Sequence, residues 1–142
     1  MPEIRLLPFH DWLVELRRDF HRIPELGYQE EKTAAKICQA LDQLEIPYQS
    51  AVGKTGVVAR IKADKKGPLV AYRADMDALP LEEVNDVSYK SQHQGRMHAC
   101  GHDIHMTTWI GAARDLVARK PEWSGTLVMI AQPAEELGLD IQ

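Results

Sequence analysis

The chain has 142 residues, of which 44% are hydrophobic and 27% are charged, and its formal net charge is −4. These values are those of one ordinary globular domain and exclude a largely disordered chain. An acidic chain without a basic block lacks the positive surface that binds nucleic acid or an anionic membrane. Its apolar runs are too short to cross a bilayer, which takes about 20 apolar residues. Because its two cysteines form no disulfide framework and its first residues resemble no secretory signal, we expect a reduced, cytoplasmic location.

Apolar residues at helical spacing predict helices over residues 10–22, 30–45 and 103–119. Apolar runs bounded by glycine and proline predict strands over residues 48–52, 57–63, 69–74 and 126–131. The runs at 69–72 and 127–131 are too continuous for a half-exposed sheet and favour central strands covered on both faces. We therefore expect an α/β fold, a three-layer sandwich with a mostly parallel central sheet.

Polar side chains gather where the predicted strands end, which is where ligands bind in open α/β sheets. Asp75 and Asp77 follow one strand, and Glu135 and Glu136 follow the last strand. The segment 98–103, just before the third predicted helix, has the sequence His-Ala-Cys-Gly-His-Asp. The sequence therefore predicts a site in which cysteine, histidine and carboxylate side chains meet.

Cys100 and His102 are two positions apart, so their side chains point the same way if the backbone is extended or turning there. Asp103 then caps the following helix, whose N-terminus favours a thiolate at Cys100. Thiolate and imidazole are ligands of zinc and related ions, and His98 and His105 lie close by in the sequence. A buried thiol among hydrogen-bonded histidines is one alternative. A cysteine nucleophile is another, although it leaves the carboxylates without a task.

The acidic pairs are compatible with metal-assisted hydrolysis. Neighbouring side chains diverge, so one of Glu135 and Glu136 can hold an ion while the other takes a proton from water. A solvated acidic loop is the commoner situation for such a pair. Asp75 and Asp77 share one side of an extended chain and can bind the ion, orient an imidazole or cap the next turn.

Four segments together resemble a known family. They are RRDFHRIPELG at 17–27, RADMDALP at 73–80, MHACGHD at 97–103 and QPAEE at 132–136. Their order and spacing are similar to those of the amidohydrolase branch of the aminoacylase-type metallopeptidases. This branch includes hippurate hydrolases, N-acyl-amino-acid amidohydrolases and plant auxin-conjugate hydrolases.

The resemblance implies a dinuclear centre that hydrolyses the amide bond of an N-acyl amino acid or small peptide with zinc, manganese, nickel or cobalt. Three positions match family metal ligands: Cys100, His102 and Glu136. Glu135 matches the general base that activates the attacking water and then protonates the leaving amine. Asp77 matches a carboxylate that supports the site, and Asp75 occupies the position of a metal-binding histidine in more distant members. Asp103 is a weaker candidate.

Family members are longer, and their two further histidine ligands and their dimerisation domain lie beyond the equivalent of residue 142. We therefore expect residues 1–142 to form a partial catalytic domain without the dimerisation domain. Three protein ligands can hold one ion but not easily two, so we expect the isolated chain to be inactive or nearly so. An uncovered sheet edge favours self-association. A non-catalytic metal-binding or interaction remnant of the same fold, or a domain without metal, are the alternatives.

Overall fold

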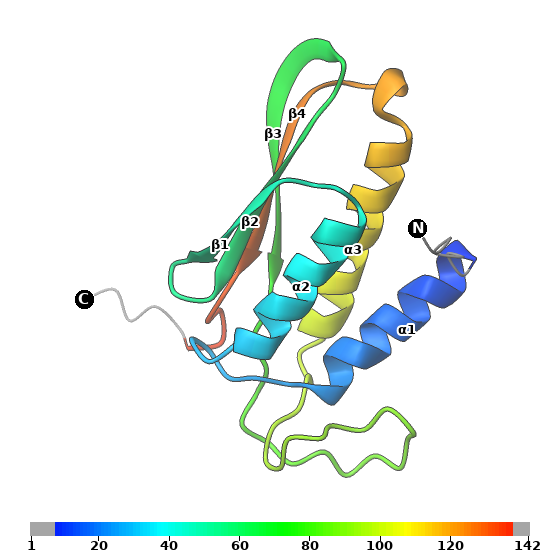
Figure 1. Ribbon diagram of the computed structural model, residues 1–142. Helices are drawn as coiled ribbons and strands as arrows, with labels where there is room; N and C mark the ends of the chain where they lie inside the picture. Colours follow the sequence, from blue (N-terminus) through cyan, green and yellow to red (C-terminus); the bar gives the residue numbers. More distant parts are fainter. Residues whose placement is uncertain (1–7, 138–142) are drawn as a thin grey trace.

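The computed structural model describes residues 8–137 (Figure 1). Within this range the helices are α1 (Phe9–Arg22), α2 (Glu31–Gln43) and α3 (His102–Ala118), and a 3-10 turn, η1, spans Lys120–Glu122. The strands are β1 (Tyr48–Val52), β2 (Gly56–Lys62), β3 (Lys65–Asp75) and β4 (Ser124–Gln132). The predicted order of helices and strands is therefore confirmed, with small differences at the ends. None of the helices within residues 8–137 is long and apolar enough to span a membrane.

The strands form one mixed sheet in the order β1-β2-β4-β3. The α/β class is confirmed, but the expectation of a mostly parallel sheet is wrong. β2 is antiparallel to both β1 and β4, and only β3 and β4 run parallel. The reason lies in the connections. β1 and β2 are joined by the short turn 53–55, which forces an antiparallel hairpin, whereas β3 reaches β4 through the whole of α3.

The helices lie on one face of the sheet (Figure 1), and α1 packs against α3. The core between sheet and helices consists of fully buried apolar side chains that include Ile37, Leu41, Val57, Ala59, Met106, Trp109, Ile110 and Met129. Within residues 8–137 no second helical layer covers the other face, contrary to the expected three-layer sandwich. β3 is an edge strand of the described sheet rather than a central one, and its Leu69 side chain is 70% exposed.

The parallel pairing of β3 and β4 fixes the position of the predicted site. Asp75, at the end of β3, lies opposite Gln132, at the end of β4. The segments that follow both strands therefore leave the sheet side by side. α3 begins at the same end of the sheet (Figure 1), after the long segment 76–101.

Candidate metal centre

Cys100, His102 and Glu136 lie together at the carboxyl ends of β3 and β4. Each offers one ligand atom, and the three atoms lie within 4.8 Å of one another. Gly101, between the first two, has φ = 88°, a left-handed conformation that side chains other than glycine rarely adopt. The glycine turns the chain into the start of α3, so the thiol and the imidazole approach the same point.

His102 is oriented as metal-binding histidines usually are. The ring is 3% exposed, and its Nδ1–H donates a hydrogen bond to the backbone oxygen of Asp77 at 2.8 Å. Since a carbonyl oxygen can only accept, the lone pair of the neutral ring is on Nε2. Carboxylate oxygens of Asp75, Glu135 and Glu136 lie 3.6, 3.6 and 3.5 Å from Nε2. The free nitrogen thus faces three acidic side chains.

Asp77 connects two of the predicted ligands from behind. Its carboxylate is fully buried, and Oδ2 accepts a hydrogen bond from the backbone N–H of Glu136 at 2.8 Å. Its Oδ1 lies 3.3 Å from Nδ1 of His102. Burial raises the pKa of Asp77, but the His102 contact and the Glu136 N–H outweigh burial and hold this pKa below its ordinary value. Asp77 is therefore a buried anion that fixes both His102 and the backbone of Glu136.

The donor set fits a divalent cation. Oε1 of Glu136 is buried and has no hydrogen-bond partner within the described residues, although it is 3.5 Å from Nε2 of His102. A buried carboxylate oxygen without a partner is costly, and a cation would offset that cost. Cysteine, histidine and glutamate are ligands of zinc and neighbouring transition metals. The site therefore contains both suitable ligand types and an anionic atom that needs a positive partner.

The protein alone does not favour a thiolate at Cys100. The neighbouring Glu136 carboxylate, partial desolvation and the charges of Glu135 and Asp75 raise the pKa of the Cys100 thiol to about 11. The expectation that the helix N-terminus stabilises the thiolate is therefore wrong, because the acidic side chains dominate. A bound cation reverses this balance, since a coordinated thiol is deprotonated.

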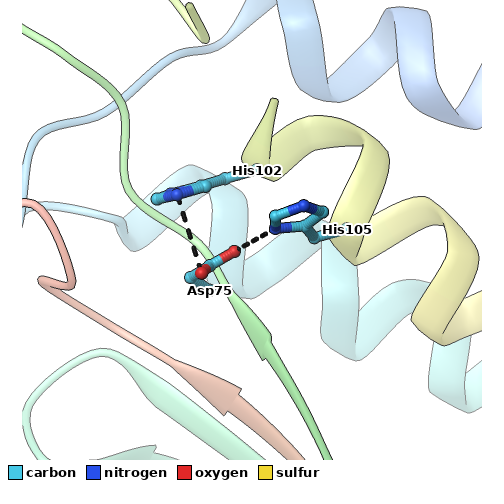
Figure 2. A group of neighbouring side chains, drawn as sticks. All are labelled: Asp75, His102 and His105. Atoms are coloured by element: carbon cyan, nitrogen blue, oxygen red, sulfur yellow. Dashed lines mark hydrogen bonds and ion pairs between the residues drawn. The ribbon is translucent and has the colours of Figure 1, made fainter. Parts of the chain in front are cut away.

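Asp75 joins His102 to a further histidine (Figure 2). Its Oδ1 pairs with Nδ1 of His105 at 2.6 Å, and the rings of His102 and His105 stack with centroids 5.5 Å apart. Asp75, His102 and His105 form a second group of three possible ligands within 4.8 Å. Burial raises the pKa of Asp75, but His105 and His102 lower it below its ordinary value. Both groups share His102, so the donors form one continuous cluster.

Asp103 is not the N-cap residue of α3 as predicted, because the helix begins one residue earlier, after Gly101. The buried Asp103 still accepts the N–H of Ile104 in the first turn, through Oδ1 at 2.9 Å, and its other oxygen makes long-range contacts. Its Oδ2 lies 2.7 Å from Nδ1 of His21 and 2.9 Å from Nε of Arg17, both on α1. A buried carboxylate is costly unless it is paired and hydrogen-bonded, and His21 and Arg17 supply these partners. Asp103 therefore anchors the start of α3 to α1.

His21 is a buried residue that the sequence analysis did not single out. It is 3% exposed, and its Nε2 lies 3.0 Å from Oε1 of Glu83 in the segment between β3 and α3. The other oxygen of Glu83 accepts the N–H of Ser91 at 2.6 Å. Hydrogen bonding to Asp103 raises the pKa of His21 above its ordinary value despite burial. The only signal in the sequence was that His21 falls within the family-like segment 17–27.

The comparisons with known proteins place this site in a family. Residues 71–140 match the family model described as peptidase family M20/M25/M40. Over 129 residues the chain is 47% identical to thermostable carboxypeptidase 2 of Saccharolobus solfataricus. The aligned residues make up 90% of this chain and 33% of that protein. The chain resembles the M20 family of peptidases. The resemblance inferred from the four segments is thereby confirmed.

Two further relatives extend the comparison. IAA-amino acid hydrolase ILR1-like 5 of Arabidopsis thaliana is 45% identical over 130 residues, which cover 92% of this chain and 30% of that protein. A crystal structure of a dinuclear metal binding peptidase of the M20 family from Bacillus subtilis superposes with a TM-score of 0.86 at 46% identity, covering 90% of this chain and 36% of that one. The chain spans about a third of the length of the curated relatives it matches.

Proposed function

We propose that this M20 chain forms the metal-binding part of a hydrolase that cleaves amide bonds in N-acyl amino acids or small peptides. The observation that carries the proposal is the convergence of ligand atoms from Cys100, His102 and Glu136 within 4.8 Å. Relatives named as a carboxypeptidase and as an IAA-amino acid hydrolase support an amide bond beside an amino acid as the target.

In this proposal a divalent ion is held by three side chains: Cys100, His102 and Glu136. Asp75 and His105 stand beside them as weaker candidates, while Asp77 and Asp103 support the ligands rather than bind the ion. When bound, the ion supplies Lewis acidity, which polarises a carbonyl oxygen and makes water easier to deprotonate. Zinc, manganese, nickel or cobalt suit the mixed sulfur, nitrogen and oxygen donors.

Glu135 is the proposed general base. Its side chain is 41% exposed, and Oε2 lies 3.6 Å from Nε2 of His102, so it is both accessible and next to the ligands. Its carboxylate takes a proton from water as the water oxygen attacks the carbonyl carbon. The protonated Glu135 then gives that proton to the amine nitrogen as the carbon–nitrogen bond breaks, which restores the carboxylate.

We also propose that residues 1–142 form part of a catalytic domain that acts in a reducing, cytoplasmic compartment on hippurate-like N-acyl amino acids. On this view the isolated chain has little or no turnover. The exposed β3 edge supports self-association at high concentration, because Leu69 and Val70 are 70% and 53% exposed there.

A chimera tests the hydrolase assignment. This chain replaces the matching third of the 47% identical Saccharolobus solfataricus carboxypeptidase, and metal content and turnover of N-acyl amino acids and dipeptides are measured. The proposal predicts turnover that Glu135→Gln abolishes while metal stays bound. A folded chimera that binds metal and hydrolyses nothing would instead favour a non-catalytic metal-binding role. Equal melting temperatures with and without chelator would favour a domain without metal.

A further inference from the structure

We infer that Glu30 is a positioning residue for the metal centre, because its buried carboxylate holds the exit of β4 so that Glu135 and Glu136 reach His102. The consequence for metal binding rests on the proposed function. The contacts themselves do not, since they lie between Glu30 and two segments far from it in sequence.

Glu30 ties three segments together. Its side chain is fully buried, and Oε1 accepts a hydrogen bond from the backbone N–H of Ala134 at 2.8 Å, just after β4. Its Oε2 accepts a hydrogen bond from the hydroxyl of Thr55 at 2.5 Å, in the turn between β1 and β2. One carboxylate therefore joins the start of α2, the β1–β2 turn and the exit of β4.

Local helix capping does not account for this buried carboxylate. Glu30 occupies the N-cap position of α2, yet its side chain makes no capping hydrogen bond. The free N–H groups of Lys32 and Thr33 are taken instead by the Glu25 carboxylate, at 3.1 and 2.8 Å. A buried carboxylate is costly unless it is hydrogen-bonded. Its partners lie at Thr55 and Ala134, so the effect of Glu30 is exerted there.

The backbone that Glu30 holds is in an unusual conformation. Ala134 has φ = 56°, a left-handed conformation that residues other than glycine seldom adopt without support from their surroundings. Two residues later, the N–H of Glu136 is bound by Oδ2 of Asp77 at 2.8 Å. Two buried carboxylates thus fix the backbone on either side of Glu135. Loss of the Glu30 contact releases the backbone on the N-terminal side of Glu135.

The test uses three variants of the full 142-residue chain, Glu30→Ala, Glu30→Gln and the matched control Glu31→Ala. Glu31 is the exposed neighbour on the same helix. Cobalt affinity is measured from the absorption spectrum, and amide hydrogen exchange at Ala134 and Glu136 is measured by NMR. We expect Glu30→Ala to weaken cobalt binding by roughly 10–100-fold, as loss of a group behind a ligand usually does. Exchange at Ala134 should become about tenfold faster.

The conservative variant separates positioning from general stability. A glutamine at position 30 retains a carbonyl oxygen that can accept the Ala134 N–H, so Glu30→Gln should stay within about threefold of wild type in cobalt affinity. Glu31→Ala should change neither measurement. If Glu30→Ala does not fold, Glu30→Asp replaces it, because the shorter side chain keeps the charge but withdraws from Ala134.

The inference is overturned if a folded Glu30→Ala or Glu30→Asp variant keeps wild-type cobalt affinity and wild-type exchange at Ala134. It is also overturned if Glu30→Gln loses as much cobalt affinity as Glu30→Ala, since the hydrogen bond to Ala134 then does not account for the loss. Failure of the proposed function is recognised separately, because wild-type chain would then bind no cobalt. In that event the exchange rate at Ala134 still decides whether Glu30 holds the exit of β4.

Discussion

Replacing His21 by alanine removes one of two cationic partners from a buried cluster and should destabilise the fold strongly. The His21 side chain lies between carboxylates of Asp103 and Glu83 that are 0% and 1% exposed, at 2.7 and 3.0 Å. Arg17 remains 2.9 Å from Asp103, but Glu83 loses its cationic partner. Removing one partner of a buried pair leaves an uncompensated charge, which costs about 3–5 kcal/mol. That is a large part of a total stability of about 5–15 kcal/mol. For a chain of this length each kcal/mol lowers the melting temperature by about 3–4 °C, so we expect a fall of about 9–20 °C.

The assay is thermal unfolding monitored by circular dichroism, with His10→Ala as the control. His10 lies on the same helix, but its side chain is 86% exposed, and its polar contact is with the exposed Asp11. The control should stay within about 0.5 kcal/mol of wild type. If His21→Ala also melts within about 2 °C of wild type, the buried cluster does not stabilise the fold and the reasoning is wrong.

The same cluster predicts a pH dependence. Hydrogen bonding to Asp103 raises the pKa of His21 above 6.5. The contribution of His21 to the free energy of unfolding is therefore complete below pH 6.5 and is lost as the pH rises through the raised native pKa. Burial raises the pKa values of Asp103 and Glu83, but contacts with His21 outweigh burial and bring them below 3.8 and 4.5. Their contributions are complete above these values and are lost as the pH falls through the lowered native pKa values. The stability difference between wild type and His21→Ala should therefore be largest at about pH 4.5–6.5. A difference that does not change between pH 3 and pH 9 would contradict this assignment of charges.

Two further substitutions test how the segments around the site are built. Glu25→Ala leaves the N–H groups of Lys32 and Thr33 without their carboxylate, so urea unfolding should show a loss of about 1–2 kcal/mol. An unchanged urea midpoint would remove Glu25 from this capping role. An alanine Cβ at position 101 would meet no atom within 4 Å, but the residue must adopt φ = 88°. Gly101→Ala should therefore lower the free energy of unfolding by about 1–2 kcal/mol. Gly101→Asn should lower it less, because asparagine tolerates this conformation. Equal losses for the two variants would show that backbone conformation is not the cause.

The local elements could be predicted because each leaves a periodic pattern in the sequence. The helices and strands lie close to where apolar spacing placed them, as α1 at Phe9–Arg22 illustrates. The strand pairing was less accessible. The apolar run at 69–72 correctly indicated a strand, but apolar composition does not reveal which neighbours a strand has. The short connection between β1 and β2 requires an antiparallel pair whatever the fold class, because a parallel pair needs a longer crossover connection.

The candidate site divides in the same way. Cys100, His102 and Glu136 could be grouped because they follow strand ends or precede a helix, and parallel strands bring such positions together. The residues that support these ligands could not be grouped from the sequence. His21 and Asp103 are 82 positions apart, and Glu30 and Ala134 are 104 apart. A single buried histidine or glutamate has no period, so the sequence pattern does not distinguish it from a surface residue.

We propose that Cys100, His102 and Glu136 bind one divalent cation. Cobalt titration of the 142-residue chain tests it most directly, because a thiolate ligand gives cobalt a charge-transfer absorption band. We expect wild type and Cys38→Ala to show this band and Cys100→Ala to lack it, since Cys38 lies on α2 and is not one of the grouped ligands. Glu136→Gln should weaken the affinity by roughly 10–100-fold. A band that persists in Cys100→Ala, or wild-type affinity in Glu136→Gln, would contradict the account.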